Sequence, residues 1–188
     1  MPSMPLRYTV RMDDELTRVR QALHPITEAS RTLAWARERP WTPETHVWLE
    51  HGAPCVDLHD LSVKLGQQAV EIVAKLAPAL STGAALFITG RGKHSVDGHS
   101  QLAAGVEETL ARLEAQHGWS YRPQSRGRLV LLTDESRAPA ALSGRLGIGF
   151  WAASAVFTLL AGLASPYLGL VVALAVLGLF WMDRQAKR

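Results

Sequence analysis

Hydrophobic and polar positions repeat with two different periods in the middle of the chain, between residues 53 and 134. Short apolar runs with the length of strands lie at 54–61, 85–90, 119–123 and 127–134. Apolar residues spaced by three or four positions, as in amphipathic helices, lie at 62–80 and 98–118. The order β-α-β-α-β-β predicts an α/β two-layer sandwich over 53–135, in which the first crossover is right-handed and joins parallel strands.

Residues 1–52 show a weaker pattern, which predicts an N-terminal helical extension. Residues 1–12 combine prolines with mixed polarity, and we expect them to be poorly ordered. Asp13 or Asp14 is expected to cap the first helix, and Pro25 either to interrupt it or to start a second helix.

A further short helix is expected to begin at Thr42-Pro43-Glu44 and to end at Gly52. The extension also carries apolar residues at helical spacing, namely Leu16, Val19, Leu23, Ile26 and Leu33. We expect this stripe, and the tryptophans Trp35, Trp41 and Trp48, to pack on the α/β domain. Self-association through the stripe is the alternative.

The last part of the chain changes character, because no charged residue occurs from Gly147 to Met182. Ser165-Pro166 divides this segment into two runs, each about as long as a bilayer core is thick when helical. The pattern predicts a linker at 136–146, a transmembrane helical hairpin at 147–182 in contact with the lipid bilayer, and a basic tail at 183–188. A single span with an interfacial helix and a buried hairpin are the alternatives.

Positive charges suggest how the hairpin is oriented. Arg137 and Arg145 precede it, whereas Arg184, Lys187 and Arg188 follow it. Cations at both outer ends predict a multi-pass protein of the inner membrane with its N-terminal domain in the cytoplasm. The N-terminus lacks the apolar core of a secretory signal, so none is expected.

Net charge and cysteine content exclude some classes of protein. Of 20 Lys+Arg and 17 Asp+Glu, residues 183–188 hold three and one, which leaves 17 and 16 in the rest of the chain. This near-neutral portion has no broad basic field for nucleic acid, so any such site must be local. The single Cys55 excludes an internal disulfide framework and suits a reducing compartment.

The stretch FITGRGKHS, residues 87–95, places two glycines and two cations directly after a predicted strand. It fails the Walker A pattern and the dinucleotide-binding G-x-G-x-x-G pattern. A loop of this kind still allows backbone N–H groups to approach an anion, and Arg91, Lys93 and His94 add cationic donors. The N-terminus of the following helix can aim positive potential at the same place. The residue types therefore favour a phosphate, such as one of a nucleic-acid backbone.

Asp57 and His59 follow the preceding strand, and their spacing places them on one face of it. An aspartate can orient a histidine and favour its protonated form, while the imidazole moves a proton near neutral pH. Because the carboxyl ends of parallel strands meet at one edge, this pair and the glycine loop are expected to face one site. Together they predict a phosphodiester site.

Three motifs in this order resemble the Smr domain, the small MutS-related module: VDLHDLS, FITGRGKHS and GRLVLL. The resemblance covers residues 54–133 and implies a fold similar to the C-terminal domain of bacterial translation initiation factor three. Many Smr proteins are nicking endonucleases or ribonucleases, and some act on messenger RNA at stalled ribosomes. The family's D-x-H motif falls on Asp57 and His59. Its T-G-x-G motif and the His-Ser pair after it fall on Thr89, Gly90 and Gly92, and on His94 and Ser95.

Two departures from the family pattern concern the charge of the site. Asp60 stands where the family usually has glycine, and its carboxylate is expected to repel phosphate. The sequence SRGR at 125–128 replaces the usual glycine-rich approach to the last strand. It adds Arg126 and Arg128, whose positive charges are expected to compensate.

Together with the predicted hairpin, the resemblance predicts a membrane-anchored endonuclease that acts on RNA more than DNA, without a cofactor. Its catalytic residues are expected to be Asp57, His59 and His94. Phosphate or nucleic acid is expected to bind Thr89, Gly90, Arg91, Gly92, Lys93, Ser95, Arg126 and Arg128. A metal site built from Asp57, His59, His94 and His99 is an alternative at the level of mechanism, although the close spacing of a dedicated zinc site is absent.

Two other functional classes are open at this point. The first is a non-catalytic module that binds nucleic acid or the ribosome at the membrane. The second is a structural membrane protein whose α/β domain recruits a partner protein. Loss of cleavage with retained binding after replacement of His59 would separate an enzyme from a binding module.

Overall fold

The computed structural model describes residues 6–34, 40–90, 100–125 and 127–143. Helices α1 (Leu6–Ala22), α2 (His24–Ser30) and α3 (Pro43–His46) precede strands β1 (Val47–Glu50) and β2 (Ala53–Asp57). They are followed by α4 (Val63–Leu76), the short 3₁₀ helix η2 (Ala77–Ala79), β3 (Ala84–Ile88) and α5 (Gln101–His117). Strands β4 (Ser120–Ser125) and β5 (Arg128–Leu132) and helix α6 (Ala140–Ser143) complete the described chain.

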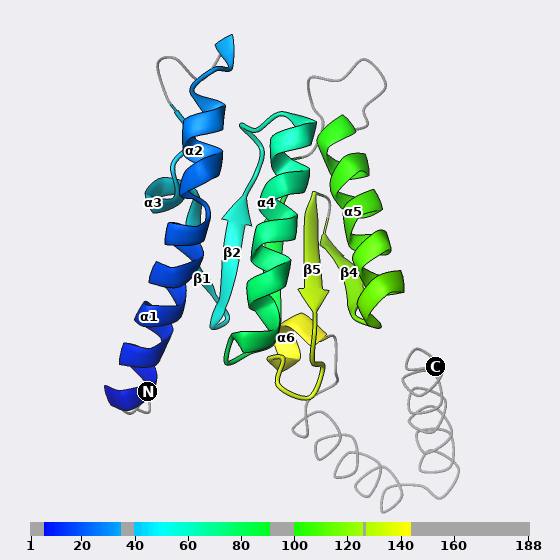
Figure 1. The fold of residues 1–188 in the computed structure, drawn as a ribbon. Helices are drawn as coiled ribbons and strands as arrows, with labels where there is room; N and C mark the ends of the chain where they lie inside the picture. Colours follow the sequence, from blue (N-terminus) through cyan, green and yellow to red (C-terminus); the bar gives the residue numbers. More distant parts are fainter. Residues whose placement is uncertain (1–5, 35–39, 91–99, 126, 144–188) are drawn as a thin grey trace, which may run out of the picture. The chain divides into compact units, whose positions relative to one another are not determined.

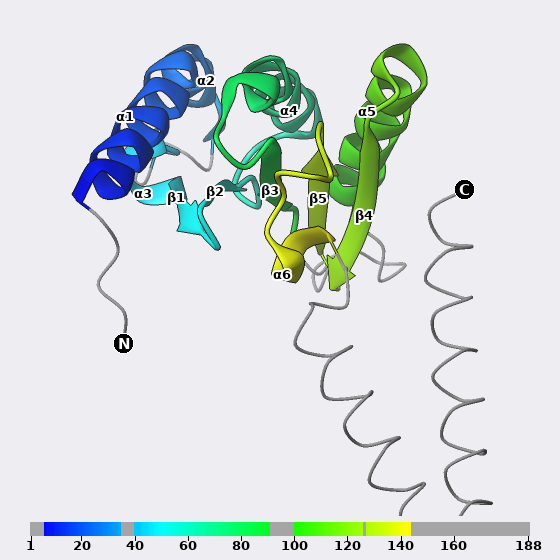
Figure 2. The ribbon, with the colours of Figure 1, turned by 90° about the horizontal axis from the view of Figure 1, so that it is seen from below.

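The strands form one five-stranded sheet in the order β1-β2-β3-β5-β4. β2 and β3 are parallel, whereas all other neighbours are antiparallel. Helices α1, α2, α4 and α5 cover one face of the sheet, and α6 lies against the other face near one end (Figures 1 and 2). A mixed α/β fold and the strand–helix order of 53–134 are therefore confirmed, and so is the parallel first crossover.

The main core lies between the sheet and the helices. Buried residues of the sheet pack there against the apolar faces of α4 and α5, as the helical period predicts. The members contributed by the sheet include Val47, Val56, Phe87, Leu129 and Leu131. A second, smaller cluster lies on the opposite face, where Leu142 of α6 packs with Cys55, Leu86, Val130 and Leu132.

The start of the first helix differs from its prediction. Helix α1 already begins at Leu6, within the stretch expected to be poorly ordered, so Asp13 and Asp14 lie inside the helix and not at its start. Glu15 explains how the helix is fixed. Its carboxylate is 3% exposed and accepts hydrogen bonds from the backbone N–H and the hydroxyl of Ser81 at 3.1 and 2.9 Å.

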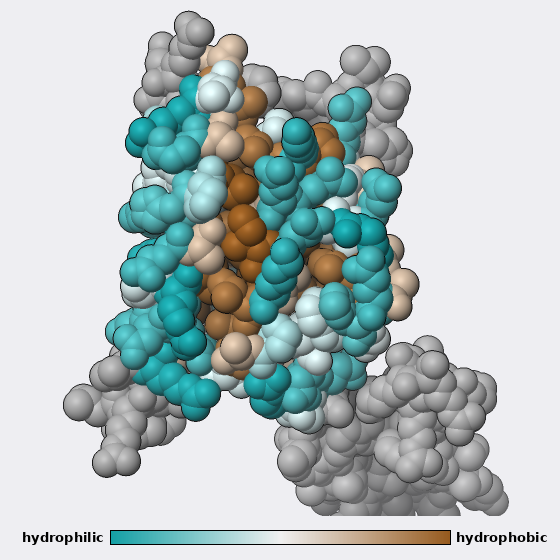
Figure 3. Space-filling view, viewed as in Figure 1, coloured by the Kyte–Doolittle hydropathy of each residue, from teal (hydrophilic) through white to brown (hydrophobic). Residues whose placement is uncertain are grey.

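Apolar residues of the N-terminal segment join the main core, as predicted. Val19, Leu23 and Ile26 are buried in it, and α2 begins at His24 beside Pro25. Apolar side chains also remain visible between α1–α2 and α4 in Figure 3. The partly buried residues of α1, α2, α4 and the segment after α2 that pack on the core are Leu16, Ala29, Leu33, Ile72 and Leu76.

The helix predicted from Thr42 to Gly52 is wrong beyond His46. Residues Val47–Glu50 form the edge strand β1, antiparallel to β2. His51 and Gly52 both have positive φ, 52° and 80°, as in the two-residue turns that join antiparallel strands. Arg20 of α1 donates from Nη2 to the carbonyl oxygen of Val47 at 2.7 Å and so ties the N-terminal helix to this strand.

Helices α4 and α5 cross at two glycines. A Cβ atom built on Gly105 would lie 2.6 Å from Cγ1 of Val63, and one built on Gly66 would lie 2.4 Å from Cδ1 of Leu102. The amide of Gln67 also donates to the carbonyl oxygen of Gly105 at 3.1 Å. The absence of side chains at these two positions therefore allows the close approach that places both helices on the sheet.

The predicted membrane hairpin, 147–182, lies outside the described residues. Within the described ranges, no helix combines the length and apolarity needed to cross a membrane.

Candidate functional site at the carboxyl edge of β2 and β3

The carboxyl ends of β2 and β3 lie side by side, as their parallel pairing requires. Asp57 is paired with Ile88, and the backbone N–H of Leu58 donates to the carbonyl oxygen of Ile88 at 2.8 Å. Beyond the strands, a Cβ atom built on Gly90 would lie 3.5 Å from Cβ of His59. The predicted meeting of the D-x-H pair with the start of the glycine loop is thus confirmed for these residues.

His59 and Asp60 occupy the centre of a tight turn between β2 and α4. The turn is closed by a hydrogen bond from the N–H of Leu61 to the carbonyl oxygen of Leu58, at 2.9 Å. Asp60 does not have a positive φ angle, so this position does not require glycine. Aspartate is a common turn residue, and the departure from the Smr motif at Asp60 therefore changes charge without straining the backbone.

Asp57 and His59 form the predicted pair. Nδ1 of His59 lies 2.6 Å from Oδ1 of Asp57, and the same oxygen accepts the backbone N–H of His59 at 3.1 Å. The side chain of Asp57 is 18% exposed and that of His59 is 50% exposed. The carboxylate is therefore largely buried beneath the imidazole ring, whereas the ring is accessible to solvent. This is the arrangement in which an aspartate fixes the orientation of a catalytic histidine.

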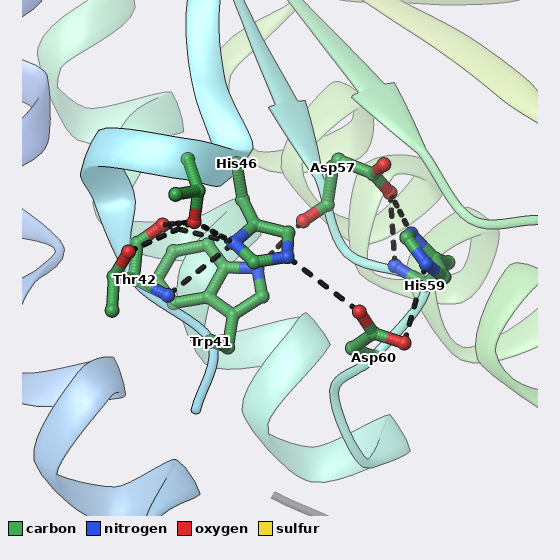
Figure 4. A network of polar contacts seen from close by, with 7 residues as sticks. Trp41, Thr42, His46, Asp57, His59 and Asp60 are labelled. Atoms are coloured by element: carbon green, nitrogen blue, oxygen red, sulfur yellow. Dashed lines mark hydrogen bonds and ion pairs between the residues drawn. The ribbon is translucent and has the colours of Figure 1, made fainter. Parts of the chain in front are cut away.

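Asp60 contacts the other nitrogen of the same ring. Its Oδ1 lies 3.2 Å from Nε2 of His59, and its Oδ2 lies 3.5 Å from Nε2 of His46 (Figure 4). A carboxylate only accepts hydrogen bonds when ionised, so carboxylates on both ring nitrogens of His59 favour the imidazolium form.

The pKa of His59 reflects opposing effects. Burial by itself would lower it, but the hydrogen bond to Asp57 and the negative charges of Asp57 and Asp60 outweigh burial and raise the pKa above 6.5. The two carboxylates thus favour the imidazolium form of this ring more than solvent does for a free histidine.

His46 and Trp41 belong to the same network, although the sequence pattern did not single out His46. The rings of Trp41 and His46 stack with centroids 5.5 Å apart, and those of His46 and His59 are 6.3 Å apart. Trp41 is 1% exposed, and its Nε1–H donates to the carbonyl oxygen of Asp57 at 2.7 Å. The expected packing role of Trp41 is confirmed, and through it α3 is joined to the end of β2. The two-residue turn after β1 could have revealed that His46 lies beside β2.

Thr89 and Gly90 lie at the end of β3. Gly90 has a φ angle of +76°, a conformation that glycine adopts without strain. Thr89 is 2% exposed, and its backbone N–H donates to the carbonyl oxygen of Gly127. The hydroxyl of Ser100, which caps α5 by accepting the N–H of Ala103 at 3.2 Å, donates to the carbonyl oxygen of Thr89 at 3.4 Å. The N-terminus of α5 is therefore held against this end of β3.

Arg128 has a different environment from the one expected of a phosphate ligand. Its guanidinium binds the carboxylate of Glu50 and contacts Sγ of Cys55 at 3.9 Å. The ion pair with Glu50 raises the pKa of Arg128. Arg128 was expected to offset the negative charge of Asp60. It does so less than expected, because its own charge is already neutralised by Glu50.

The other predicted site residues lie outside the described ranges. These are Arg91, Gly92, Lys93, His94, Ser95 and Arg126, together with His99 of the alternative metal site. Among the described residues, no group of three or more His, Cys, Asp or Glu side chains is arranged to hold a metal ion.

Comparison with known proteins gives no family for the chain: no family model, curated protein or solved structure matches it.

Proposed function

We propose that the chain is a membrane-anchored endonuclease of the Smr type, which cleaves phosphodiester bonds in nucleic acid, with RNA preferred over DNA. The observation that carries the proposal is the 2.6 Å contact between Asp57 and Nδ1 of His59, beside Gly90 at the shared edge of two parallel strands. This is the edge at which open α/β sheets bind ligands.

His59 is the proton-transfer group in this proposal, and Asp57 is its positioning residue. Asp57 holds Nδ1, which leaves Nε2 as the nitrogen that reaches the substrate. As imidazolium, His59 protonates the departing 5′-oxygen; as neutral imidazole, it accepts a proton. RNA supplies its own nucleophile in the 2′-hydroxyl, so the reaction has no need for a metal-activated water.

Phosphate binding is assigned to the loop that follows β3. Gly90 and Gly92 contribute backbone N–H groups, and Arg91 and Lys93 contribute positive charge. Thr89, Ser95 and Arg126 complete the assigned set, and His94 stays assigned as a catalytic residue. The left-handed conformation of Gly90 and the capped start of α5 at Ser100 support an anion site here.

The membrane anchor is assigned to residues 147–182, which contain no charged residue. In this arrangement, the α/β domain faces the cytoplasm as part of a multi-pass inner-membrane protein. Alkaline extraction of membranes tests the assignment: the full-length chain should stay in the pellet, whereas release into the supernatant would overturn it.

A second function is favoured by one observation. The Asp60 carboxylate lies 3.2 Å from Nε2 of His59, where a substrate has to bind. If this carboxylate stays in place, Nε2 of His59 cannot reach a phosphodiester and the chain does not cleave. It then serves as a non-catalytic module that binds nucleic acid or the ribosome at the membrane.

A single comparison separates the two functions. The full-length chain in detergent micelles is incubated with end-labelled RNA in EDTA, alongside His59→Ala and the control His24→Ala, whose histidine lies on α2 outside the network. An endonuclease should lose cleavage but keep RNA binding in His59→Ala, while the control cleaves normally. Binding without cleavage by the wild-type chain, with and without Mg²⁺, on RNA and DNA, would contradict the endonuclease and support the binding module.

A further inference from the structure

We propose that His46 is a second proton-transfer residue of this site, and that Asp60 occupies, in the substrate-free protein, the place that a substrate phosphate takes between His46 and His59. The inference rests on the proposed function and assigns a further catalytic residue and a self-inhibiting one.

The position of Asp60 is the first argument. Its two carboxylate oxygens point to two different imidazoles, Oδ1 to Nε2 of His59 at 3.2 Å and Oδ2 to Nε2 of His46 at 3.5 Å (Figure 4). A carboxylate and a phosphodiester each offer two oxygens that share one negative charge. Asp60 thus stands in for the anion that two facing imidazoles are suited to bind.

His46 is held as firmly as His59, which is the second argument. Its ring stacks on the buried Trp41 at an interplanar angle of 24°, and its side chain is 17% exposed. Its Nδ1 lies 2.7 Å from the hydroxyl of Thr45 and 3.0 Å from the carbonyl oxygen of Thr42. Since these local groups occupy Nδ1, the nitrogen turned toward Asp60 and His59 is Nε2, as in a positioned catalytic histidine.

The two rings are suited to opposite roles. Asp57 stabilises the imidazolium of His59, which makes His59 the proton donor. Nδ1 of His46 lies 3.0 Å from the carbonyl oxygen of Thr42, which can accept from it, and 3.3 Å from the backbone N–H of Thr42, which can donate to it. In the neutral tautomer that carries its proton on Nδ1, Nε2 is unprotonated and can accept a proton. A base and an acid on either side of one phosphate are what cleavage by an internal 2′-hydroxyl requires.

In the proposed step, phosphorus exchanges its bond to the 5′-oxygen for a bond to the 2′-oxygen. Nε2 of His46 takes the proton of the 2′-hydroxyl, and the 2′-oxygen forms a bond to phosphorus. The bond from phosphorus to the 5′-oxygen breaks, and that oxygen receives the proton from Nε2 of His59. The products are a 2′,3′-cyclic phosphate and a 5′-hydroxyl, and proton exchange with water restores both rings.

Asp60 must leave before a phosphate can enter. Its side chain is 49% exposed and belongs to the turn at 58–61, so a change of side-chain rotamer takes it into solvent. While in place, it competes with the substrate for both imidazoles and repels its charge. Removing the negative charge of Asp60 should therefore strengthen phosphate binding.

The test measures phosphate binding and cleavage separately. Inorganic phosphate is titrated into the full-length chain in micelles, and the ring resonances of His46 and His59 are followed by NMR. Asp60→Asn should bind phosphate about fivefold more tightly than wild type, with both rings responding, because one like charge near the anion is removed. Glu28→Gln, which removes the same charge from the exposed surface of α2, should bind as wild type does.

His46→Asn tests the second histidine, because asparagine retains a polar group near the position of Nδ1 but has no Nε2. Added to Asp60→Asn, it should abolish the gain in phosphate affinity, and alone it should lower the rate of RNA cleavage about a hundredfold. A midpoint of denaturant unfolding equal to that of wild type would establish that the variant is folded. His46→Gln provides a second variant if that criterion fails.

Several outcomes separate this inference from the proposed function. RNA cleavage at the wild-type rate by folded His46 variants would overturn the inference and leave the endonuclease intact. Phosphate affinity that is equal in wild type and Asp60→Asn would overturn the role of Asp60. Phosphate binding as predicted, without RNA cleavage in any variant, would overturn the endonuclease and the role of His46 in proton transfer, but not the place assigned to Asp60.

Discussion

Oδ1 of Asp57 accepts two hydrogen bonds from His59, one from Nδ1 at 2.6 Å and one from the backbone N–H at 3.1 Å. The aspartate thereby fixes both the ring and the backbone of the histidine that follows it on the same strand end. The chemistry proposed for the site depends on this relationship.

Replacement of Asp57 should lower the pKa of His59. The wild-type pKa is raised above 6.5 because Asp57 and Asp60 together outweigh the effect of burial. Asp57→Asn removes the hydrogen-bonded charge and should lower the pKa more than Asp60→Asn, which removes only a neighbouring charge. An NMR titration of the His59 ring in the full-length chain measures both shifts. A larger effect of Asp60→Asn would contradict the assigned roles.

The same pKa shift predicts how stability depends on pH. A histidine whose pKa is raised on folding stabilises the native state fully below the unfolded value of 6.5, and this contribution is lost as pH rises through the folded pKa. The free energy of unfolding should therefore fall between pH 6 and 8 more steeply in wild type than in His59→Gln. Denaturant unfolding at both pH values checks this. Equal slopes would show that the carboxylates do not stabilise charged His59.

Gly105→Ala tests the crossing of α4 and α5. Helix propensity alone predicts stabilisation by up to about 1 kcal/mol, because alanine is the better helix former. The added Cβ would lie 2.6 Å from the stiff side chain of Val63, so we expect a net loss of about 1–3 kcal/mol in the free energy of unfolding. Combining it with Val63→Ala should recover part of that loss, and simple additivity of the two would argue against the clash.

Glu15 should fix α1 to the rest of the domain. Its buried carboxylate accepts hydrogen bonds from the backbone N–H and hydroxyl of Ser81. Glu15→Ala leaves the buried N–H without an acceptor and should cost about 1–3 kcal/mol of unfolding free energy. Glu15→Gln keeps one acceptor oxygen and should cost less. Equal losses in the two variants, measured by denaturant unfolding, would mean that the hydrogen bonds are not the cause.

Cys55 should be unreactive in the folded protein. It is buried in the sheet, and burial raises the pKa of its thiol to about 12, against the smaller opposing effect of Arg128. Thiolate is the reactive form, so a thiol reagent at pH 8 should modify Cys55 only at the rate of unfolding or on addition of denaturant. Rapid modification under native conditions would contradict this burial.

Much of the fold follows from the sequence because its longer elements have clear periods. The amphipathic period of residues 63–76 places Ala69, Val70 and Val73 in the core, and Gly118 ends α5 with a φ angle of 67°. The short strand β1 escaped prediction because four residues cannot show a period, and Thr42-Pro43-Glu44 pointed to a helix. Its pairing with β2 across His51-Gly52 decides its structure.

The site was predictable only in part for a related reason. Asp57, His59 and Gly90 were placed together by the parallel pairing of their strands. The approach of His46 to Asp60 depends on α3 and the unexpected β1, and only the two-residue turn after β1 could have indicated it. The sequence alone indicated that the carboxylate of Asp60 would repel a bound phosphate. That this carboxylate contacts Nε2 of His59 became known only from the structure.

The most direct test of the central claim uses one RNA oligonucleotide and its copy with a single 2′-deoxynucleotide at the cleaved linkage, both in EDTA. The account predicts that the wild-type full-length chain cleaves the RNA to a 2′,3′-cyclic phosphate, does not cleave the 2′-deoxy linkage, and loses this activity in His59→Ala. Equal cleavage of both oligonucleotides, or cleavage that persists in His59→Ala, would contradict it.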